Sequence, residues 1–203
     1  MSNNSLNEEL LQLFLNYLEF EKKSSKHTVI SYKNDISQFL NCIGEVTIPE
    51  VTSKDVRYWI SELSKEGIAP KSINRKITAI RSFFYYLQQQ NRLSQNVARK
   101  VHSLKTKKRL PNFVEEEKMN ILLDQNFFSE GFVGLRDKTI IELLYTTGIR
   151  RAELLGLTLK SIDFSDGSMK VFGKRSKERI VPLLPECIAL LKTYIAERNK
   201  IAE

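Results

Sequence analysis

Four successive segments in the first half of the chain carry apolar residues at helical spacing, and this pattern limits the first half to a helical fold. Residues three or four apart lie on one face of a helix, so each segment is expected to be amphipathic with that face buried. In the first two segments the apolar residues are Leu10, Phe14, Tyr17 and Leu18, and then Val29, Tyr32, Ile36, Phe39 and Leu40.

The third and fourth segments also carry signals for where a helix begins and ends. The third runs from about Ser53 to Glu66, with Thr52 and Asp55 at capping-box spacing before it and Gly67 after it. The fourth begins at Pro70, a residue suited to a first helical turn. Its apolar stripe consists of Ile73, Ile77, Ile80, Phe84 and Leu87. Four helices with short connections predict a small bundle.

The pattern changes at Ala98–Phe113, a stretch with six Lys or Arg residues between Arg99 and Arg109, little apolar periodicity and a proline. This composition predicts an inter-domain linker. After it we expect a short helix near Glu115–Leu123, an apolar helix near Leu135–Thr147, a small antiparallel sheet from Met169–Phe172 and Glu178–Val181, and a last helix from Pro185. The expected fold is therefore mainly α, with a mixed α+β second part.

Positive charge is concentrated in one block of the chain. The net charge is +8, yet residues 22–109 hold 18 Lys or Arg against 6 Asp or Glu, whereas residues 110–203 hold 14 of each. A basic block in a folded chain favours a polyanionic partner such as nucleic acid, and a solvated lysine-rich surface is the alternative. No apolar run could span a membrane, the start does not resemble a signal peptide, and the two cysteines match no metal spacing. A cytoplasmic protein is expected.

Two of the expected helices have polar faces without acidic residues. Opposite the isoleucine stripe lie Lys71, Arg75, Thr78 and Ser82, and the second helix similarly presents Lys26, His27, Ser31, Asn34 and Gln38. Solvated faces usually mix acids with bases, and these side chains are of the types that meet phosphates and base edges. The pattern predicts contact with a DNA groove, with plain solvent exposure as the alternative. Replacing Arg75 with Ala is expected to weaken DNA binding without unfolding the bundle.

The stretch Leu143–Leu157, "LLYTTGIRRAELLGL", places two arginines among leucines. Gly148 allows a positive backbone angle before a helix that Leu154, Leu155 and Leu157 are expected to anchor. Arg150 and Arg151 fall in the first turn, where backbone amides also favour an anion, and Glu153 could hold Arg150 in place. A planar guanidinium suits bidentate phosphate binding, so the predicted anion is a phosphate; a structural ion pair is the alternative.

The expected hairpin has a basic tip, Gly173–Lys177, with three positive charges. Such a tip is either simply solvated or carries a lysine that reaches a phosphate and donates a proton to a leaving oxygen.

Several stretches, in this order, resemble the tyrosine recombinases of the phage integrase family, of the Xer type. They are "FLNYLEFEKKSSKHTVISYKNDISQFL", "TSKDVRYWISEL", "SINRKITAIRSFFYYL", "KRLPNFVEEE", "LLYTTGIRRAELLGL" and "VFGKRSKERIVPL". The resemblance implies a four-helix, SAM-like core-binding domain at residues 1–106 and the N-terminal part of a mixed α+β catalytic domain at 107–203. It also implies site-specific recombination such as chromosome-dimer resolution, through a 3′-phosphotyrosyl intermediate, by tetramers on double-stranded DNA. The resemblance implies that the protein uses no metal, no other cofactor and no small-molecule substrate.

By the same resemblance, Arg150 takes the place of the first catalytic arginine, which grips the scissile phosphate. Lys174 takes the place of the hairpin lysine, preferred over Lys177, and Arg151 is at a variable position. The family's His-x-x-Arg motif, later His or Trp and nucleophilic Tyr find no match, because no His follows His102 and none of the seven tyrosines lies in the nucleophile's context. We therefore expect the N-terminal portion of a recombinase that binds DNA without cleaving it. The alternatives are a non-catalytic DNA-binding or regulatory module on the same fold and a helical protein-interaction domain.

Overall fold

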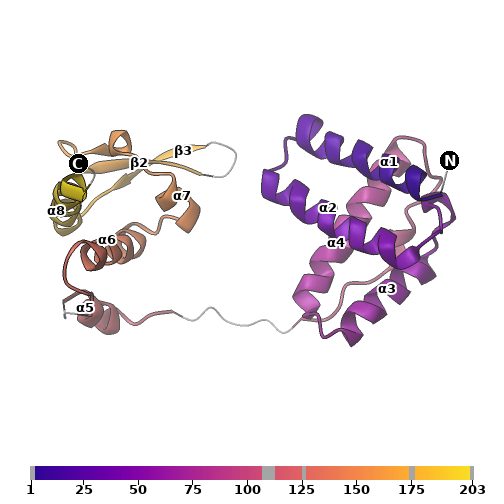
Figure 1. Cartoon of the computed structure of the whole chain (residues 1–203), viewed down its shortest axis with the longest axis horizontal. Helices are drawn as coiled ribbons and strands as arrows, with labels where there is room; N and C mark the ends of the chain where they lie inside the picture. The colour runs from indigo at the N-terminus through magenta and orange to yellow at the C-terminus, as the bar shows by residue number, and fades with distance from the viewer. Residues whose placement is uncertain (1–2, 107–112, 125–126, 174–176, 202–203) are drawn as a thin grey trace. The chain divides into compact units, whose positions relative to one another are not determined.

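The chain divides into two compact units, Met1–Arg109 and Leu110–Glu203, and each has a hydrophobic core of its own (Figure 1). The computed structural model describes residues 3–106, 113–124, 127–173 and 177–201. Helices dominate both units, and a three-stranded antiparallel sheet lies in the second. The predicted fold class, mainly α with a small antiparallel sheet, is confirmed.

The first unit contains the four predicted helices. They are α1 (Asn3–Asn16), α2 (Lys26–Ile43), α3 (Ser53–Lys65) and α4 (Pro70–Gln89), and a π-helical turn, Tyr17–Glu21, extends α1. The capping box of α3 forms as predicted: the backbone N–H and the hydroxyl of Thr52 donate to Asp55 Oδ2 at 2.8 and 2.7 Å. Gly67, with φ +77°, follows the helix end in a left-handed conformation that a side chain would disfavour.

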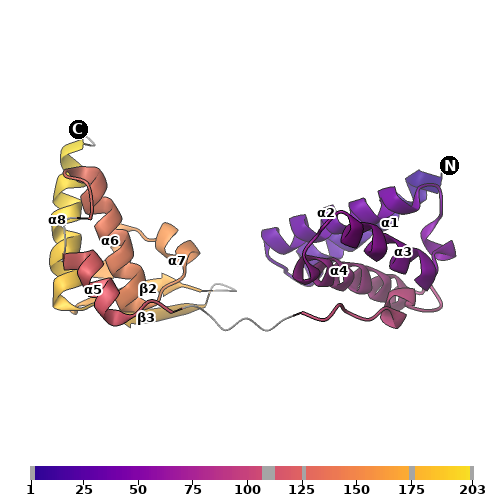
Figure 2. The same ribbon diagram turned by 90° about the horizontal axis from the view of Figure 1, so that it is seen from below.

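Aromatic side chains fill the core of this bundle. The largest fully buried ones are Trp59, Phe14, Phe39, Phe83 and Phe84. Phe39 meets the Trp59 indole edge-on at 5.3 Å between ring centroids. This aromatic pair contributes to the packing of α2 against α3. The helix α4 packs along α2 and contacts α1 and α3 as well (Figure 2). Its isoleucine stripe therefore lies at the centre of the core.

The start of the predicted linker belongs to the bundle, and this part of the expectation is corrected. Val97–Lys100 forms a 3₁₀ turn, and Ala98 and Val101 are buried in the first core. The Arg81 side chain donates to the carbonyl oxygens of Ala98 and Val101. These contacts are non-local, which is why local composition does not reveal them.

The second unit places two helices on one sheet. Its elements are α5 (Glu116–Asp124), α6 (Phe132–Thr147), α7 (Arg151–Leu155), β1 (Ile162–Asp163), β2 (Ser168–Phe172), β3 (Glu178–Pro182) and α8 (Pro185–Ile201). The helices α6 and α8 lie side by side (Figure 2), and the strand order is β1-β2-β3. Met169 and Val171 point from β2 into the core, paired with Val181 and Arg179 of β3.

The segment from Gly148 to Leu157 confirms one prediction and corrects another. Gly148 ends α6 in the left-handed conformation, with φ +61°, as predicted. Leu154 and Leu157 pack on the second core, but Leu155 is 73% exposed, so it does not anchor the helix. Among the described residues, no helix combines the length and the apolar character that crossing a bilayer requires.

Candidate nucleic-acid interface

The polar faces of α2 and α4 meet at a buried carboxylate. Asp35, on α2, has a side chain only 2% exposed, and two cations from α4 satisfy it. Arg75 donates to Asp35 Oδ2, and Lys76 Nζ lies 3.1 Å from Asp35 Oδ1. Lys76 Nζ also lies 2.5 Å from Oε1 of Gln38, one turn further along α2. The two faces are therefore cross-linked into one continuous surface.

This network corrects the sequence-based account of Arg75. Its side chain is 48% exposed, as its place opposite the isoleucine stripe predicts, but it is ion-paired to the neighbouring helix. The exposed residues of the two faces include no acid, but the buried carboxylate of Asp35 pairs with Arg75. Sequence reasoning missed both Asp35 and Lys76, because each lies at the border of an apolar stripe and neither has a local signal of pairing.

The other residues of the predicted DNA-binding set lie on the same surface. Exposed members are Lys26, His27, Asn34, Lys71 and Thr78, whereas Ser31 and Ser82 are half-buried. The Thr78 hydroxyl donates to the Asn74 carbonyl at 2.9 Å, so only its oxygen lone pairs are available to a ligand. The surface thus offers several exposed donors on two helices that pack together.

In the second unit, Arg150 stands at the residue before α7 and is held there by Glu153. Arg150 Nη1 lies 2.9 Å from Glu153 Oε1, and the Arg150 backbone N–H donates to Glu153 Oε2 at 2.8 Å. The predicted ion pair is confirmed, and the Arg150 side chain is still 71% exposed. Because α7 spans only five residues, the guanidinium rather than the helix end is the candidate anion ligand.

A second arginine, Arg179 on β3, binds the same carboxylate. Its Nη1 and Nη2 lie 2.8 and 2.7 Å from Oε1 and Oε2 of Glu153, a bidentate pair. Sequence analysis missed this residue because 26 positions separate it from Glu153. The two guanidinium groups hold the pKa of Glu153 at about 2, below its ordinary 4.5, through hydrogen bonds from Arg179 first and from the backbone and side chain of Arg150 after it.

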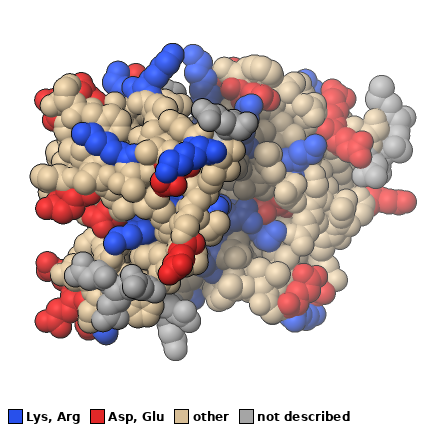
Figure 3. All heavy atoms as spheres, turned by 60° about the vertical axis from the view of Figure 1, so that its left-hand side comes forward, with Lys and Arg blue, Asp and Glu red and all other residues tan. Residues whose placement is uncertain are grey.

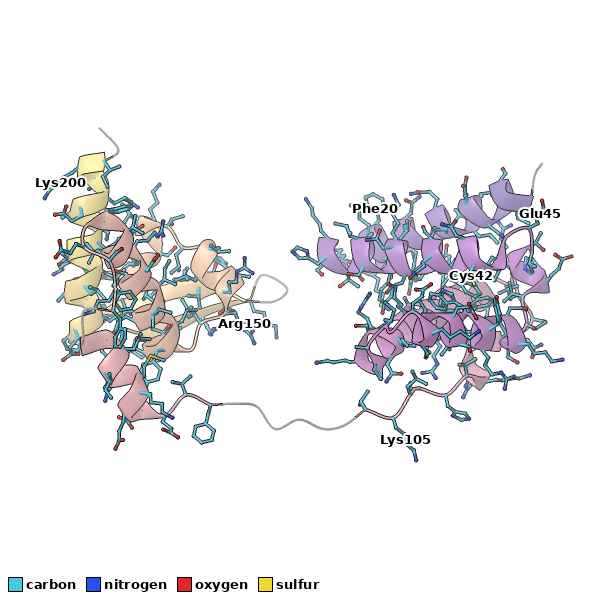
Figure 4. All side chains as sticks on the ribbon, turned by 60° about the horizontal axis from the view of Figure 1, so that its bottom comes forward. Phe20, Cys42, Glu45, Lys105, Arg150 and Lys200 are labelled. Atoms are coloured by element: carbon cyan, nitrogen blue, oxygen red, sulfur yellow. The ribbon has the colours of Figure 1, made fainter. Side chains whose placement is uncertain are left out.

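The hairpin between β2 and β3 begins beside this cluster. The Gly173 backbone N–H donates to the Lys177 carbonyl at 2.7 Å, and a Cβ at Gly173 would lie 3.4 Å from Arg179 Nη1. Figure 4 shows Arg150 at the edge of the second unit. The predicted catalytic Lys174 lies outside the described residues.

Charge of both signs reaches the surface of the second unit. Figure 3 shows Lys and Arg side chains interspersed with Asp and Glu on the face that it presents. Residues 110–203 hold equal numbers of acids and bases. Electrostatic attraction to a polyanion in this unit therefore depends on local clusters such as Arg150 and Arg179 rather than on net charge.

Comparison with known proteins identifies the family. Residues 11–91 match the phage integrase N-terminal SAM-like domain, and residues 112–203 match the phage integrase family. The tyrosine recombinase XerD of Chlorobaculum tepidum is 39% identical over 92% of this chain and 63% of its own length. The tyrosine recombinase XerC of Oceanobacillus iheyensis is 36% identical over 95% of this chain and 64% of its own length. The chain thus spans just under two thirds of the length of these curated relatives.

A solved structure shares the fold at low sequence identity. The lambda integrase tetramer bound to a Holliday junction is similar over 92% of this chain and 52% of its own, with a TM-score of 0.70 and 17% identity. That likeness shows the fold. The two family matches and the curated relatives show that the chain belongs to the phage integrase family of tyrosine recombinases and is of the Xer type.

Proposed function

We propose that this chain binds duplex DNA as part of a site-specific recombinase of the Xer type. We assign strand cleavage through a 3′-phosphotyrosyl link, and the resolution of chromosome dimers, to recombinases as long as the XerC and XerD relatives. These 203 residues themselves bind DNA and do not cut it. The observation that carries the proposal is the exposed Arg150 side chain, fixed by a buried carboxylate. From the match of its sequence to the family pattern, we assign Arg150 the role of the first catalytic arginine.

The α2–α4 surface supports DNA binding by the first unit. Exposed Lys26, His27, Asn34 and Lys71 carry donors on two helices that Asp35 cross-links, so the donors are held at fixed spacing. Phosphate contacts from such residues set the register of a protein on DNA, and base-edge contacts set its specificity. In this proposal Lys71 and Lys26 meet phosphates, and the amide of Asn34 reaches a base edge.

Arg150 supports phosphate binding by the second unit. The Arg150 side chain is 71% exposed and its guanidinium gives one hydrogen bond to Glu153, so most of its five N–H groups are free to meet the two oxygens of a phosphodiester. We assign Lys174 the role of assisting the leaving 5′-hydroxyl in a cleavage-competent protein. That assignment rests on its place directly after Gly173 in the family pattern.

The absence of cleavage is proposed from the tyrosines. Tyr194 stacks on Phe132 at 5.7 Å between ring centroids, and Tyr17 stacks on Tyr86 at 4.7 Å, which are packing roles. No tyrosine hydroxyl is hydrogen-bonded to Arg150 or Glu153 in the part of the chain that the structure describes. A cation that binds phosphate without a nucleophile beside it can hold the scissile bond but cannot form a phosphotyrosyl link.

We also propose that other recombinase subunits are the protein partners. The lambda integrase of similar fold is a tetramer on a Holliday junction. Assembly of this chain on paired DNA sites would follow the same plan, with each copy contributing one α2–α4 surface.

Two measurements test the proposal. Fluorescence anisotropy of a labelled duplex, titrated with the chain at rising salt, should show affinity that falls steeply, because bound cations release counterions from DNA. Incubation with a nicked suicide substrate, followed by denaturing electrophoresis, should show no covalent protein–DNA adduct. Salt-independent binding would refute the DNA interface, and an adduct would refute the assignment of the tyrosines. In the anisotropy assay Arg150→Ala should weaken binding, and Arg151→Ala is its matched control, since the two residues are adjacent and equal in charge.

A further inference from the structure

We propose that Arg179 is a positioning residue that keeps Arg150 available for DNA phosphate by occupying Glu153. The inference rests on the proposed function, since it concerns the same phosphate contact. Nothing in the sequence pattern or in the comparisons gives Arg179 this role; the arrangement of the hydrogen bonds does.

The geometry at Glu153 is a competition between two arginines for one carboxylate. A carboxylate offers about four lone-pair sites, and four hydrogen bonds fill them here. Two come from Arg179, one to each oxygen, and the others come from the Arg150 backbone N–H and Nη1. With both oxygens taken by Arg179, Arg150 is left a single side-chain hydrogen bond.

Without Arg179, Glu153 would be free to capture Arg150. The Glu153 side chain is only 4% exposed, so without the Arg179 guanidinium its carboxylate would be poorly hydrated, which favours a closer pair with a remaining cation. Arg150 is the nearest, already bonded to Oε1. A bidentate Arg150–Glu153 pair would turn the guanidinium inward and neutralise it. With both arginines present, the cluster keeps a net charge of +1.

The location of Arg179 also ties the hairpin to the cluster. Arg179 pairs with Val171 across the sheet, and its Nη1 lies close to the backbone of Gly173, where the hairpin begins. The Arg179–Glu153 pair therefore joins β3 to α7. A change that loosens this pair is expected to affect Arg150 and the base of the hairpin together.

The test measures the affinity of the full chain for a short fluorescent duplex. Arg179→Met should weaken binding about tenfold, the factor expected for loss of one charge-assisted contact. The matched control Arg151→Met removes the same charge from an exposed neighbour and should change affinity by less than about threefold. Adding Glu153→Gln to Arg179→Met should restore most of the affinity, because an amide cannot capture Arg150 as a carboxylate does, yet it still accepts from the Arg150 backbone.

The outcomes separate this inference from the proposed function. If Arg150→Ala leaves binding unchanged, the phosphate contact itself is refuted. If Arg150→Ala weakens binding but Arg179→Met behaves like Arg151→Met, the positioning role alone is refuted. If Glu153→Gln fails to restore binding, Arg179 contacts DNA directly, which also overturns the inference. Should Arg179→Met not fold by circular dichroism, Arg179→Lys serves instead: it keeps the charge but lacks the planar two-pronged geometry of the guanidinium, so a smaller loss with the same rescue by Glu153→Gln is expected.

Discussion

Replacing Arg75 with Ala is expected to destabilise the first unit as well as weaken DNA binding, because Arg75 is one of two cations that neutralise a buried carboxylate. Asp35 is 2% exposed in its side chain, Lys76 is 13% exposed and Arg75 is 48% exposed. A hydrogen bond to a charged group contributes about 1.5–3 kcal/mol. Screening at the half-exposed Arg75 reduces this to about 1 kcal/mol.

The same reasoning orders a series of variants. Lys76→Ala should cost more, about 2–3 kcal/mol, since Lys76 is nearly buried and its loss removes bonds to both Asp35 and Gln38. Removing both cations leaves the carboxylate unpaired and should cost about 3–5 kcal/mol. Each kcal/mol corresponds to about 4–8 °C in the unfolding midpoint of a unit this size.

The assay exploits the single tryptophan of the chain, Trp59, which is buried in the first unit. Its fluorescence during urea unfolding reports this unit alone. An Arg75→Ala midpoint equal to wild type, or a larger loss for Arg75→Ala than for Lys76→Ala, would refute the reasoning. Combining Arg75→Ala with Asp35→Asn should recover part of the loss, and Arg75→Lys, which can keep the pair, isolates the effect on DNA affinity.

Three further predictions concern other contacts. Thr52→Ala removes the hydroxyl from the capping box of α3 and should lower stability by about 1 kcal/mol. The pKa of Asp55 is held below its ordinary value first by the backbone N–H of residue 52, which alanine keeps, and then by the Thr52 hydroxyl, so it should rise only part of the way toward that value in a carbon-13 NMR titration. Asn7→Ala leaves the Ile48 N–H and the Val46 carbonyl without the side-chain partner they now have at 2.8 and 2.9 Å, and should cost about 3 kcal/mol in the urea assay; a loss under about 1 kcal/mol would show that water replaces the amide. Because the pKa of Glu153 falls to about 2 on folding, the stability that it contributes is complete above its ordinary 4.5 and is lost as the pH falls toward 2. Acid unfolding of the second unit, followed by far-ultraviolet circular dichroism, should therefore become less steep in that range in Glu153→Gln, and an unchanged acid limb would contradict this.

Local patterns were sufficient to predict most of the elements. The apolar stripes predicted the four helices of the bundle, Thr52 and Asp55 predicted the start of α3, and Gly148 predicted the end of α6. Each signal lies within one or two helical turns of the feature that it determines. The prediction that the chain becomes a linker at Ala98 was wrong because the contacts that hold this segment are not local. Its neighbours Arg99 and Lys100 are charged and exposed, and what holds it is the side chain of Arg81 on another element.

The candidate sites show the same limit. Arg150 and Glu153, three residues apart, could be paired from helical spacing. Arg179 could not be joined to them, since the contact requires the strand register that pairs it with Val171. Arg75 was correctly expected to be exposed, but its partner Asp35 lies 40 residues away on another helix. An ion pair between two helices, or between a helix and a strand, cannot be predicted from the residue spacing within either element.

The most direct test of the central claim is lysine footprinting of the full chain with and without duplex DNA, read by mass spectrometry after acylation. The claim is that the joined polar faces of α2 and α4 contact DNA. Lys26 and Lys71 should lose most of their reactivity when DNA is bound, whereas Lys54 on α3 and Lys192 on α8, both exposed, should keep theirs. Protection of Lys54 with Lys26 and Lys71 still reactive would place the DNA on another face and contradict the account.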